Sequence, residues 1–285
     1  NSAVASALQT AINDDATLSS AGKTVSVKWT GVKYESVSNT GSIDASGAIG
    51  GGEVLIGGDY QGNNPNISNA QNTFVSGDIS ADALENGDGG RVIVWADDTT
   101  DFSGVISVVG GASSGNGGFV ETSGKNILKF TGSVDATAQN GETGDLLLDP
   151  IDITITTAST SGIQNTSSTW ESDDTAGSSM LNVSDLLTSL SSANVTISTQ
   201  QNSSGQTAPA GGDITVSTAI DNSGNNNNLT LVAGEDISIF FPITMGASGD
   251  LTLQAGQRSD IDSGAVLATA ALTANDLVVE ADTII

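Results

Sequence analysis

Short runs of alternating apolar and polar residues recur along the chain. In 213–217 and in 250–254, every second residue is aliphatic, and the residues beside them are Asp, Ser, Thr or Gln. A period of two places alternate side chains on opposite faces of a β-strand, one face buried and the other solvated. Glycine, asparagine and aspartate stand between the runs, where they favour tight turns. The pattern therefore predicts an all-β chain of short strands joined by turns.

Two sequence markers repeat along the chain at a similar interval. The first is a phenylalanine with a glycine two or three positions after it: Phe74 with Gly77, Phe102 with Gly104, and Phe130 with Gly132. The second is a glycine that opens an apolar run: Gly90, Gly118 and Gly144. The phenylalanines are equally spaced, and the second set of glycines keeps nearly the same spacing. Because both markers recur about every 27 residues, the sequence predicts an internal repeat.

A repeat of this length fits one coil of a parallel β-solenoid, with two or three short strands and the turns between them. Equivalent residues of successive coils would lie about 4.8 Å apart. The three phenylalanines would then form a buried column. A β-sandwich array is the competing architecture, but such arrays repeat at about 100 residues and bury more aromatic residues than the 4% found here.

The regularity of the repeat varies along what we interpret as a single solenoid segment, 1–285. Its parts are an entry region at 1–39, the best-defined coils at 40–156, a loop with a short helix at 157–192, and further coils at 193–285. The chain begins with Asn1 rather than Met and ends inside an apolar run, so we expect it to be a fragment of a longer protein.

Two stretches depart from the strand pattern. Apolar residues at helical spacing predict short flanking helices near 3–12 and 184–192, with Ser184 as the N-cap of the second. Residues 157–180 are rich in Ser, Thr and Asp and are predicted to form a loop. Long turns are predicted at 199–210 and in the asparagine run 225–228.

The chain is strongly acidic, with 33 acidic residues, 7 basic residues and a net charge of −26. Such a balance argues against nucleic-acid binding and against a polybasic attachment to anionic membrane. It is typical of a solvated, self-repelling surface that keeps a repetitive β-protein soluble. Every apolar run is far shorter than the roughly 18 residues that a membrane-spanning helix needs, so we expect no such helix.

Candidate catalytic and metal-binding chemistry is sparse. The chain has no Cys and no His, so it lacks disulfides, thiolate ligands and the commonest catalytic base. Adjacent aspartates at 97–98 could act on a glycan only where a loop brings them together, because neighbouring strand residues point to opposite faces. Few basic residues could assist a polysaccharide lyase, and Arg91, Lys125 and Lys129 are the set that could share a face. We therefore expect no catalytic residues and no enzyme.

Bound groups are also expected to be few. Neither the calcium-binding nonapeptide nor the EF-hand loop occurs, so we expect no cofactor beyond incidental calcium at Asp-rich turns. Trp29, Trp95 and Trp170 could stack on sugars if they are exposed. Trp95 follows an apolar run and is the candidate glycan contact, with a core or corner position as the alternative.

Four segments resemble the filamentous-haemagglutinin-like exoproteins of bacteria. They are GGEVLIGGDYQG at 51–62, NGDGGRVIVWAD at 86–97, GGFVETSG at 117–124, and TGDLLLDPIDITI at 143–155. The resemblance covers about 40–255, with generic motifs beyond 155, and it does not include the family's N-terminal secretion domain. The short run 64–67 is similar to part of a motif of that domain, but it lies inside a repeat and is interpreted as a turn.

The resemblance implies a right-handed parallel β-helix that is exported by two-partner secretion through an outer-membrane transporter. It also implies a structural stalk or adhesive segment on the bacterial cell surface. Such a segment would attach to cells, surfaces or biofilm matrix through a glycan or protein receptor. A polysaccharide-processing β-helix enzyme and the stalk of a contact-dependent toxin exoprotein are the alternatives.

Overall fold

A computed structural model describes residues 24–26, 34–159, 163–166, 169–172, 179–199, 212–257 and 264–285. Strands make up 46% of the structure, which confirms an all-β fold with several all-parallel sheets. The predicted helix near 3–12 and Trp29 lie outside the described residues. The chain divides into two compact units, the first formed by Asn1–Thr122 and Gly132–Leu146, the second by Ser123–Thr131 and Leu147–Ile285.

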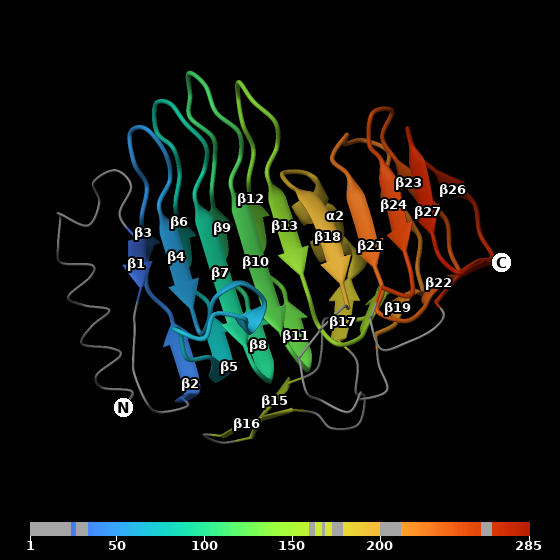
Figure 1. Cartoon of the computed structure of the whole chain (residues 1–285), viewed down its shortest axis with the longest axis horizontal. Coiled ribbons are helices and arrows are strands. Elements are labelled where there is room, and N and C mark those ends of the chain that lie inside the picture. Colours follow the sequence, from blue (N-terminus) through green and yellow to red (C-terminus); the bar gives the residue numbers. More distant parts are fainter. Residues whose placement is uncertain are drawn as a thin grey trace. The chain divides into compact units, whose positions relative to one another are not determined.

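The first unit contains three rows of parallel strands, seen on the blue-to-green side of Figure 1. One row is β1 (Thr24–Ser26), β4 (Glu53–Ile56) and β7 (Arg91–Ala96), followed by β10 (Phe119–Gly124) and β13 (Asp145–Leu148), which cross the boundary between the units. The second row is β2 (Tyr34–Asn39), β5 (Ala70–Val75) and β8 (Thr99–Phe102). The third is β3 (Ile43–Asp44), β6 (Asp78–Ser80), β9 (Val105–Ser107) and β12 (Ser133–Asp135).

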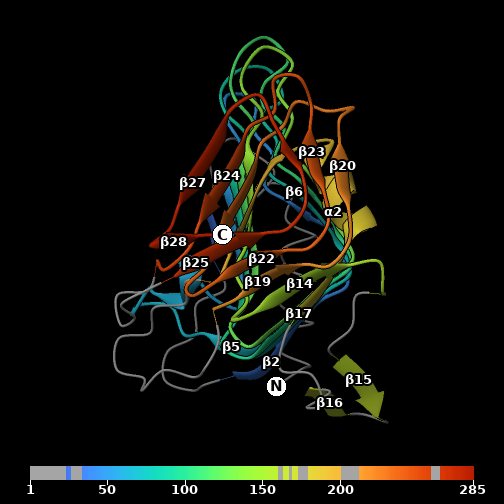
Figure 2. The same ribbon diagram turned by 90° about the vertical axis from the view of Figure 1, so that its right-hand side faces the viewer.

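The second unit repeats this arrangement, and Figure 2 shows its sheets from the side. One row is β18 (Asn194–Ser198), β21 (Leu229–Val232), β24 (Leu251–Gln254) and β27 (Leu277–Glu280). A second is β17 (Ser179–Asn182), β14 (Ile153–Thr156), β19 (Ile214–Val216), β22 (Ile237–Ile239), β25 (Ala265–Ala268) and β28 (Thr283–Ile284). A third is β20 (Ile220–Asn222), β23 (Ile243–Met245) and β26 (Leu272–Thr273), and β11 (Ile127–Phe130) also belongs to this unit.

The strand register gives the repeat length directly. Asn72 of β5 pairs with Thr99 of β8, and Val105 of β9 pairs with Ser133 of β12, so one repeat here spans about 27 residues. The step from β4 to β7 is longer, 38 residues, because 57–69 are inserted between β4 and β5. In the second unit the step from β21 to β24 shortens to 22 residues. The predicted period therefore describes 70–135 and varies elsewhere.

Aliphatic side chains of paired strands form columns through each unit. In the first unit a column of Ile43, Ile79, Ile106 and Val134 is buried. In the second unit Ile153, Ile214, Ile237 and Val266 do the same. β-Branched residues pack well on a pleated surface. Burial of the apolar side chains in each column stabilises the fold by about 25 cal/mol for each Å² of apolar surface removed from water.

The predicted phenylalanine column is wrong at its first member. Phe102 is fully buried, but it pairs with Val75, while Phe74 pairs with Asp101 and is only half-buried. A shift of one residue turns a strand side chain to the opposite face. Gly77 is the third residue after Phe74, whereas Gly104 is the second after Phe102, so the glycines are in register and the phenylalanines are not. Phe130 is buried in the second unit.

The region 157–192 also differs in part from its prediction. Within the predicted loop, β15 (Ile163–Thr166) and β16 (Thr169–Ser172) form an antiparallel pair. The predicted helix is present as α2 (Val183–Leu190), and it packs against β17, β18 and β20. Its N-cap is Asn182 rather than Ser184, because the Asn182 side chain accepts a hydrogen bond from the Ser184 N–H at 2.8 Å.

Candidate functional site

The predicted repeat glycines lie one above another where the backbones of successive strands approach most closely. A Cβ atom added at Gly104 would lie 2.2 Å from the Gly77 carbonyl oxygen, and one at Gly132 would lie 2.4 Å from that of Gly104. Such contacts are far inside van der Waals distance, so only glycine fits at these positions.

The second set of repeat glycines behaves in the same way. A Cβ atom at Gly118 would lie 2.1 Å from the Gly90 oxygen, and one at Gly144 would lie 2.0 Å from the Gly118 oxygen. Two glycine columns therefore run through the first unit, and both have a structural role.

Asparagine and aspartate side chains form a second kind of column, in which each accepts a hydrogen bond from the backbone of the next strand. Asn194 Oδ1 accepts from the N–H of Asn228 at 3.0 Å, and Asn228 Oδ1 accepts from that of Asp250 at 2.8 Å. Asp250 Oδ1 accepts in turn from the N–H of Asp276 at 3.1 Å. These bonds satisfy donors at the strand ends that would otherwise need water.

The same device recurs elsewhere in both units. In the first unit Asp88 Oδ1 accepts from the Asn116 N–H at 2.7 Å, and Asn116 Oδ1 accepts from the Glu142 N–H at 2.9 Å. In the second unit Asp213 Oδ1 accepts from the Asp236 N–H at 3.1 Å. Part of the acidic composition is therefore used to join one strand to the next.

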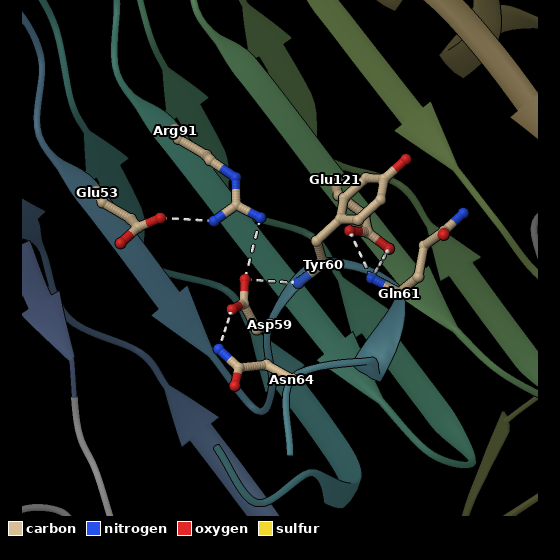
Figure 3. A network of polar contacts seen from close by, with 7 residues as sticks. All are labelled: Glu53, Asp59, Tyr60, Gln61, Asn64, Arg91 and Glu121. Carbon is tan, nitrogen blue, oxygen red and sulfur yellow. Dashed lines mark hydrogen bonds and ion pairs between the residues drawn. The ribbon is translucent and has the colours of Figure 1, made fainter. Parts of the chain in front are cut away.

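A network of polar contacts in the first unit joins the inserted loop 57–69 to the neighbouring strands (Figure 3). Arg91 of β7 forms ion pairs with Glu53 of β4 and with Asp59 of the loop. Asp59 also accepts hydrogen bonds from the Tyr60 N–H and from Asn64 Nδ2, both at 2.7 Å. The Asn64 carbonyl accepts from the Ile67 N–H at 3.1 Å, which closes the turn predicted at 64–67.

A buried carboxylate fixes the tip of this loop, the single 3-10 turn η1 (Tyr60–Gly62). Gln61 has a φ of 51°, the one positive φ of a non-glycine residue among the described residues. Its N–H donates to both carboxylate oxygens of Glu121, at 3.2 and 3.1 Å. Glu121 is fully buried in β10. The strained backbone of Gln61 is therefore held by a bifurcated hydrogen bond to the buried carboxyl group of Glu121.

Electrostatics within the cluster favour its ionised state. Burial raises the pKa of Asp59, but the hydrogen bonds from Asn64, the Tyr60 N–H and Arg91 outweigh it and hold the pKa below its ordinary value. Burial opposes the charge of Arg91 as well, yet its bonds with Glu53 and Asp59 raise the pKa of the guanidinium. The cluster therefore clamps the loop onto the sheet across three strands.

The candidate glycan contact, Trp95, lies underneath this loop rather than on the surface. It is 2% exposed, and Cβ atoms added at Gly58 or Gly62 would lie 2.6 Å from its indole ring. Its Nε1 donates to Asp97 at 3.4 Å. The position matches the alternative of a core residue. The aromatic ring that the loop does present is Tyr60, 42% exposed, with its centroid 5.9 Å from that of Phe119.

Among the residues that the structure describes, the remaining candidates are not gathered at one place within either unit. Asp97 Oδ1 accepts from Asn69 Nδ2 at 2.8 Å, so this carboxylate also holds the loop. Arg91 belongs to the first unit and is paired with carboxylates, whereas Lys125 and Lys129 belong to the second. In the described parts of the chain, no group of three or more His, Cys, Asp or Glu residues is placed to bind a metal ion.

Sequence reasoning identified Arg91 as a candidate basic residue but missed its partners. Glu53 and Asp59 are 38 and 32 residues away in sequence, and Glu121 is 60 residues from Gln61. The signal available in the sequence was the longer interval between the run that Gly90 opens and the preceding apolar run, because the extra residues mark an insertion.

Within the described residues, no helix is both long and apolar enough to cross a membrane. Comparison of the sequence with models of known protein families and with curated proteins finds no match.

Proposed function

We propose that this chain is a structural and adhesive segment of a secreted bacterial surface protein, folded as a right-handed parallel β-helix of the filamentous-haemagglutinin-like type. The observation that supports this proposal best is the pair of repeated columns that run from strand to strand. The glycine columns allow the backbones of successive strands to approach closely, and the Asn and Asp columns bond each strand to the next. An extended repetitive scaffold requires such contacts between neighbouring repeats.

The alternation of exposed and buried side chains supports the same proposal. In the second unit Thr196, Thr230 and Thr252 occupy equivalent positions of β18, β21 and β24, between buried aliphatic residues. Repeated small polar side chains give a long, hydrated surface. Attachment then comes from features that interrupt the repeat, and the clamped loop with its exposed Tyr60 is the first candidate.

The composition of the chain is also compatible with export through an outer-membrane transporter. The chain contains no cysteine, so no disulfide would obstruct passage of an unfolded chain through a two-partner transporter. Its net charge of −26 keeps the unfolded chain soluble and self-repelling until it folds outside the cell.

An in-frame deletion of residues 34–285 from the native protein tests this function. We expect the bacterium to lose attachment to host cells or to biofilm matrix, while antibody labelling shows an unchanged amount of the remaining protein at the surface. Replacing only 58–69 by a short Gly-Ser linker should reproduce part of the loss if the loop carries the contact. Undiminished attachment by the deletion strain would contradict an adhesive role.

A parallel screen addresses the enzyme alternative. The purified chain is incubated with a panel of neutral and acidic polysaccharides, and new reducing ends and unsaturated products are measured. The proposal expects none above the level of the heat-denatured chain. Robust turnover that one carboxylate substitution abolishes would overturn it.

A further inference from the structure

Two adjacent phenylalanines are exposed at a turn inside the second unit. Phe240 is 48% exposed and Phe241 is 46% exposed, and Pro242, also exposed, follows them. The other four phenylalanines of the chain are buried or half-buried. Single exposed apolar residues are ordinary on a protein surface, whereas contiguous exposed rings are a feature of binding surfaces. We call the turn 240–242 the aromatic corner.

The rings are exposed although the structure describes a neighbouring turn on each side of them. The aromatic corner joins β22 to β23, both labelled in Figure 2, and the strand register places it between the turns 217–219 and 269–271. Each of these turns has three residues, as the aromatic corner has, and they consist of Ser, Thr and Ala alone. Phe240 and Phe241 therefore project beyond neighbours that are too small to cover them.

Backbone hydrogen bonds hold the aromatic corner on both sides. The Phe240 N–H donates to the Val216 carbonyl of the preceding strand at 3.0 Å, and the Thr269 N–H of the following turn donates to the Ile239 carbonyl at 2.9 Å. A fixed backbone lowers the entropy that is lost when a ligand binds. Because these groups are already bonded, the corner is not an open strand edge to which a partner peptide could add a strand.

No charged residue belongs to the aromatic corner or to either neighbouring turn. The chain as a whole carries a net charge of −26, so these turns form an uncharged strip on an acidic molecule. An acidic polysaccharide or an anionic membrane would be repelled by the other carboxylates of the chain and would meet no cation in this strip. The charge distribution therefore favours an uncharged ligand.

Hydroxyl groups flank the rings. Ser217 and Thr269 occupy the positions equivalent to Phe240 in the preceding and following turns. Ser217 Oγ donates to the Ile155 carbonyl at 2.9 Å, and Thr269 Oγ1 donates to the Ile239 carbonyl at 3.3 Å. Each hydroxyl oxygen can still accept a hydrogen bond. A ligand that covers the rings therefore meets hydrogen-bond acceptors on either side.

We propose that the aromatic corner binds a neutral glycan. The C–H groups on one face of a pyranose ring stack on the electron-rich faces of the two phenylalanines, and the sugar hydroxyls donate to Ser217 and Thr269. Stacked strands lie about 4.8 Å apart, which brings both hydroxyls within reach of a sugar on the rings. The site belongs to the second unit, whereas the loop 57–69 belongs to the first, so it does not depend on the contact proposed for that loop.

Affinity electrophoresis of the purified 285-residue chain tests the proposal. Native gels contain mannan, xyloglucan or galactan, which are neutral, and parallel gels contain heparin or alginate, which are anionic. We expect a neutral polysaccharide to slow the chain and the anionic ones to leave its migration unchanged. The double variant Phe240→Ser with Phe241→Thr copies the preceding turn and should raise the dissociation constant about tenfold or more. Phe240→Tyr with Phe241→Tyr keeps both rings and should keep most of the binding.

A matched control and a second readout separate the rings from general effects. Leu84→Ser removes another exposed apolar side chain, 59% exposed, from the first unit and should migrate as the unchanged chain does. All variants should give the same circular dichroism, because the substituted side chains are exposed. In saturation-transfer NMR, irradiation of the aromatic protons should reach the C–H protons of a bound neutral oligosaccharide in the unchanged chain and not in the Ser-Thr double variant.

Several results would overturn the proposal. They are migration that none of the neutral polysaccharides slows, equal slowing of the unchanged chain and the Ser-Thr double variant, and slowing by the anionic polysaccharides alone. Adsorption to phosphatidylcholine vesicles that this variant loses, without slowing by any polysaccharide, would assign the rings to a membrane contact instead. Slowing that Tyr60→Ser abolishes and the double variant retains would place the glycan on the loop 57–69, which leaves the proposed function standing without this site.

Discussion

The glycine column through Gly118 makes the sharpest stability prediction. Alanine at Gly118 would place its Cβ 2.1 Å from the Gly90 carbonyl oxygen and 2.8 Å from the Val108 Cβ. An acceptable contact needs more than about 3.2 Å, so β7 and β10 must separate locally by about 1 Å. The Phe119 N–H bond to the Gly90 oxygen, 3.0 Å long, would be lost.

The magnitude follows from these two effects. Overpacking a tight interior costs about 1–3 kcal/mol, and an unsatisfied backbone pair costs about 1–3 kcal/mol more. We therefore expect Gly118→Ala to lower the free energy of unfolding by about 3–5 kcal/mol, measured by urea denaturation of the purified chain. Gly224 is the matched control, because a Cβ there meets nothing within 4 Å.

The effect of Gly118→Ala on the free energy of unfolding is judged against the effect of the Gly224→Ala control. Gly224→Ala should change the free energy of unfolding by less than about 0.5 kcal/mol. The two strands cannot be stacked as described if Gly118→Ala is as mild as Gly224→Ala. A large effect of both substitutions would instead indicate a general cost of alanine in these loops.

Three further predictions concern a buried ring, an Asp column and the loop clamp. Phe102→Ala should lower the free energy of unfolding by about 3–5 kcal/mol because this ring is fully buried. Phe74→Ala should lower it clearly less, because Phe74 lies on the other face of its strand. Equal losses of stability in urea denaturation would indicate that the phenylalanines are aligned after all. Asp250→Ala removes an acceptor that bonds Asn275 Nδ2 and the Asp276 N–H, and should cost about 1–2 kcal/mol, whereas Asp250→Asn keeps the acceptor and should recover most of it; thermal unfolding that fails to separate the two variants would argue against the column. Because the folded pKa of Asp59 lies below 3.8, its stabilising effect is present above pH 3.8 and is lost as the pH falls through the lower folded value. Acid-active protease should therefore cut the loop 57–69 faster as the pH falls below this window, and Asp59→Asn should flatten the dependence; an unchanged pH profile in the variant would exclude the clamp.

The sequence was sufficient for the class of fold because glycine and the alternating apolar pattern report local geometry. Gly90, Gly118 and Gly144 stand where a backbone approaches another backbone, and their spacing follows the strand stacking. The prediction put the Phe74 side chain on the wrong face because the spacing of the phenylalanines does not by itself determine the strand register. One extra residue between Phe74 and Gly77 turns the Phe74 side chain to the opposite face of its strand. The spacing of the glycines, not that of the phenylalanines, indicated the register.

The loop clamp could not be predicted, for a physical reason. Its members are joined only through the strand stacking, so their distances in sequence depend on every intervening turn length. Glu121 lies in the run that Gly118 opens, and nothing in its neighbourhood in sequence indicates that its carboxyl group is buried. The antiparallel pair of β15 and β16 was missed because its Ser- and Thr-rich composition is typical of loops.

A crystal structure of the purified chain tests the central claim most directly. The account predicts right-handed parallel coils in which Gly90, Gly118 and Gly144 lie one above another at the strand spacing of about 4.8 Å. It also predicts that Trp95 is buried beneath the loop 57–69. Left-handed coils, or glycines of this column that lie in different layers, would contradict the scaffold on which the proposed function depends.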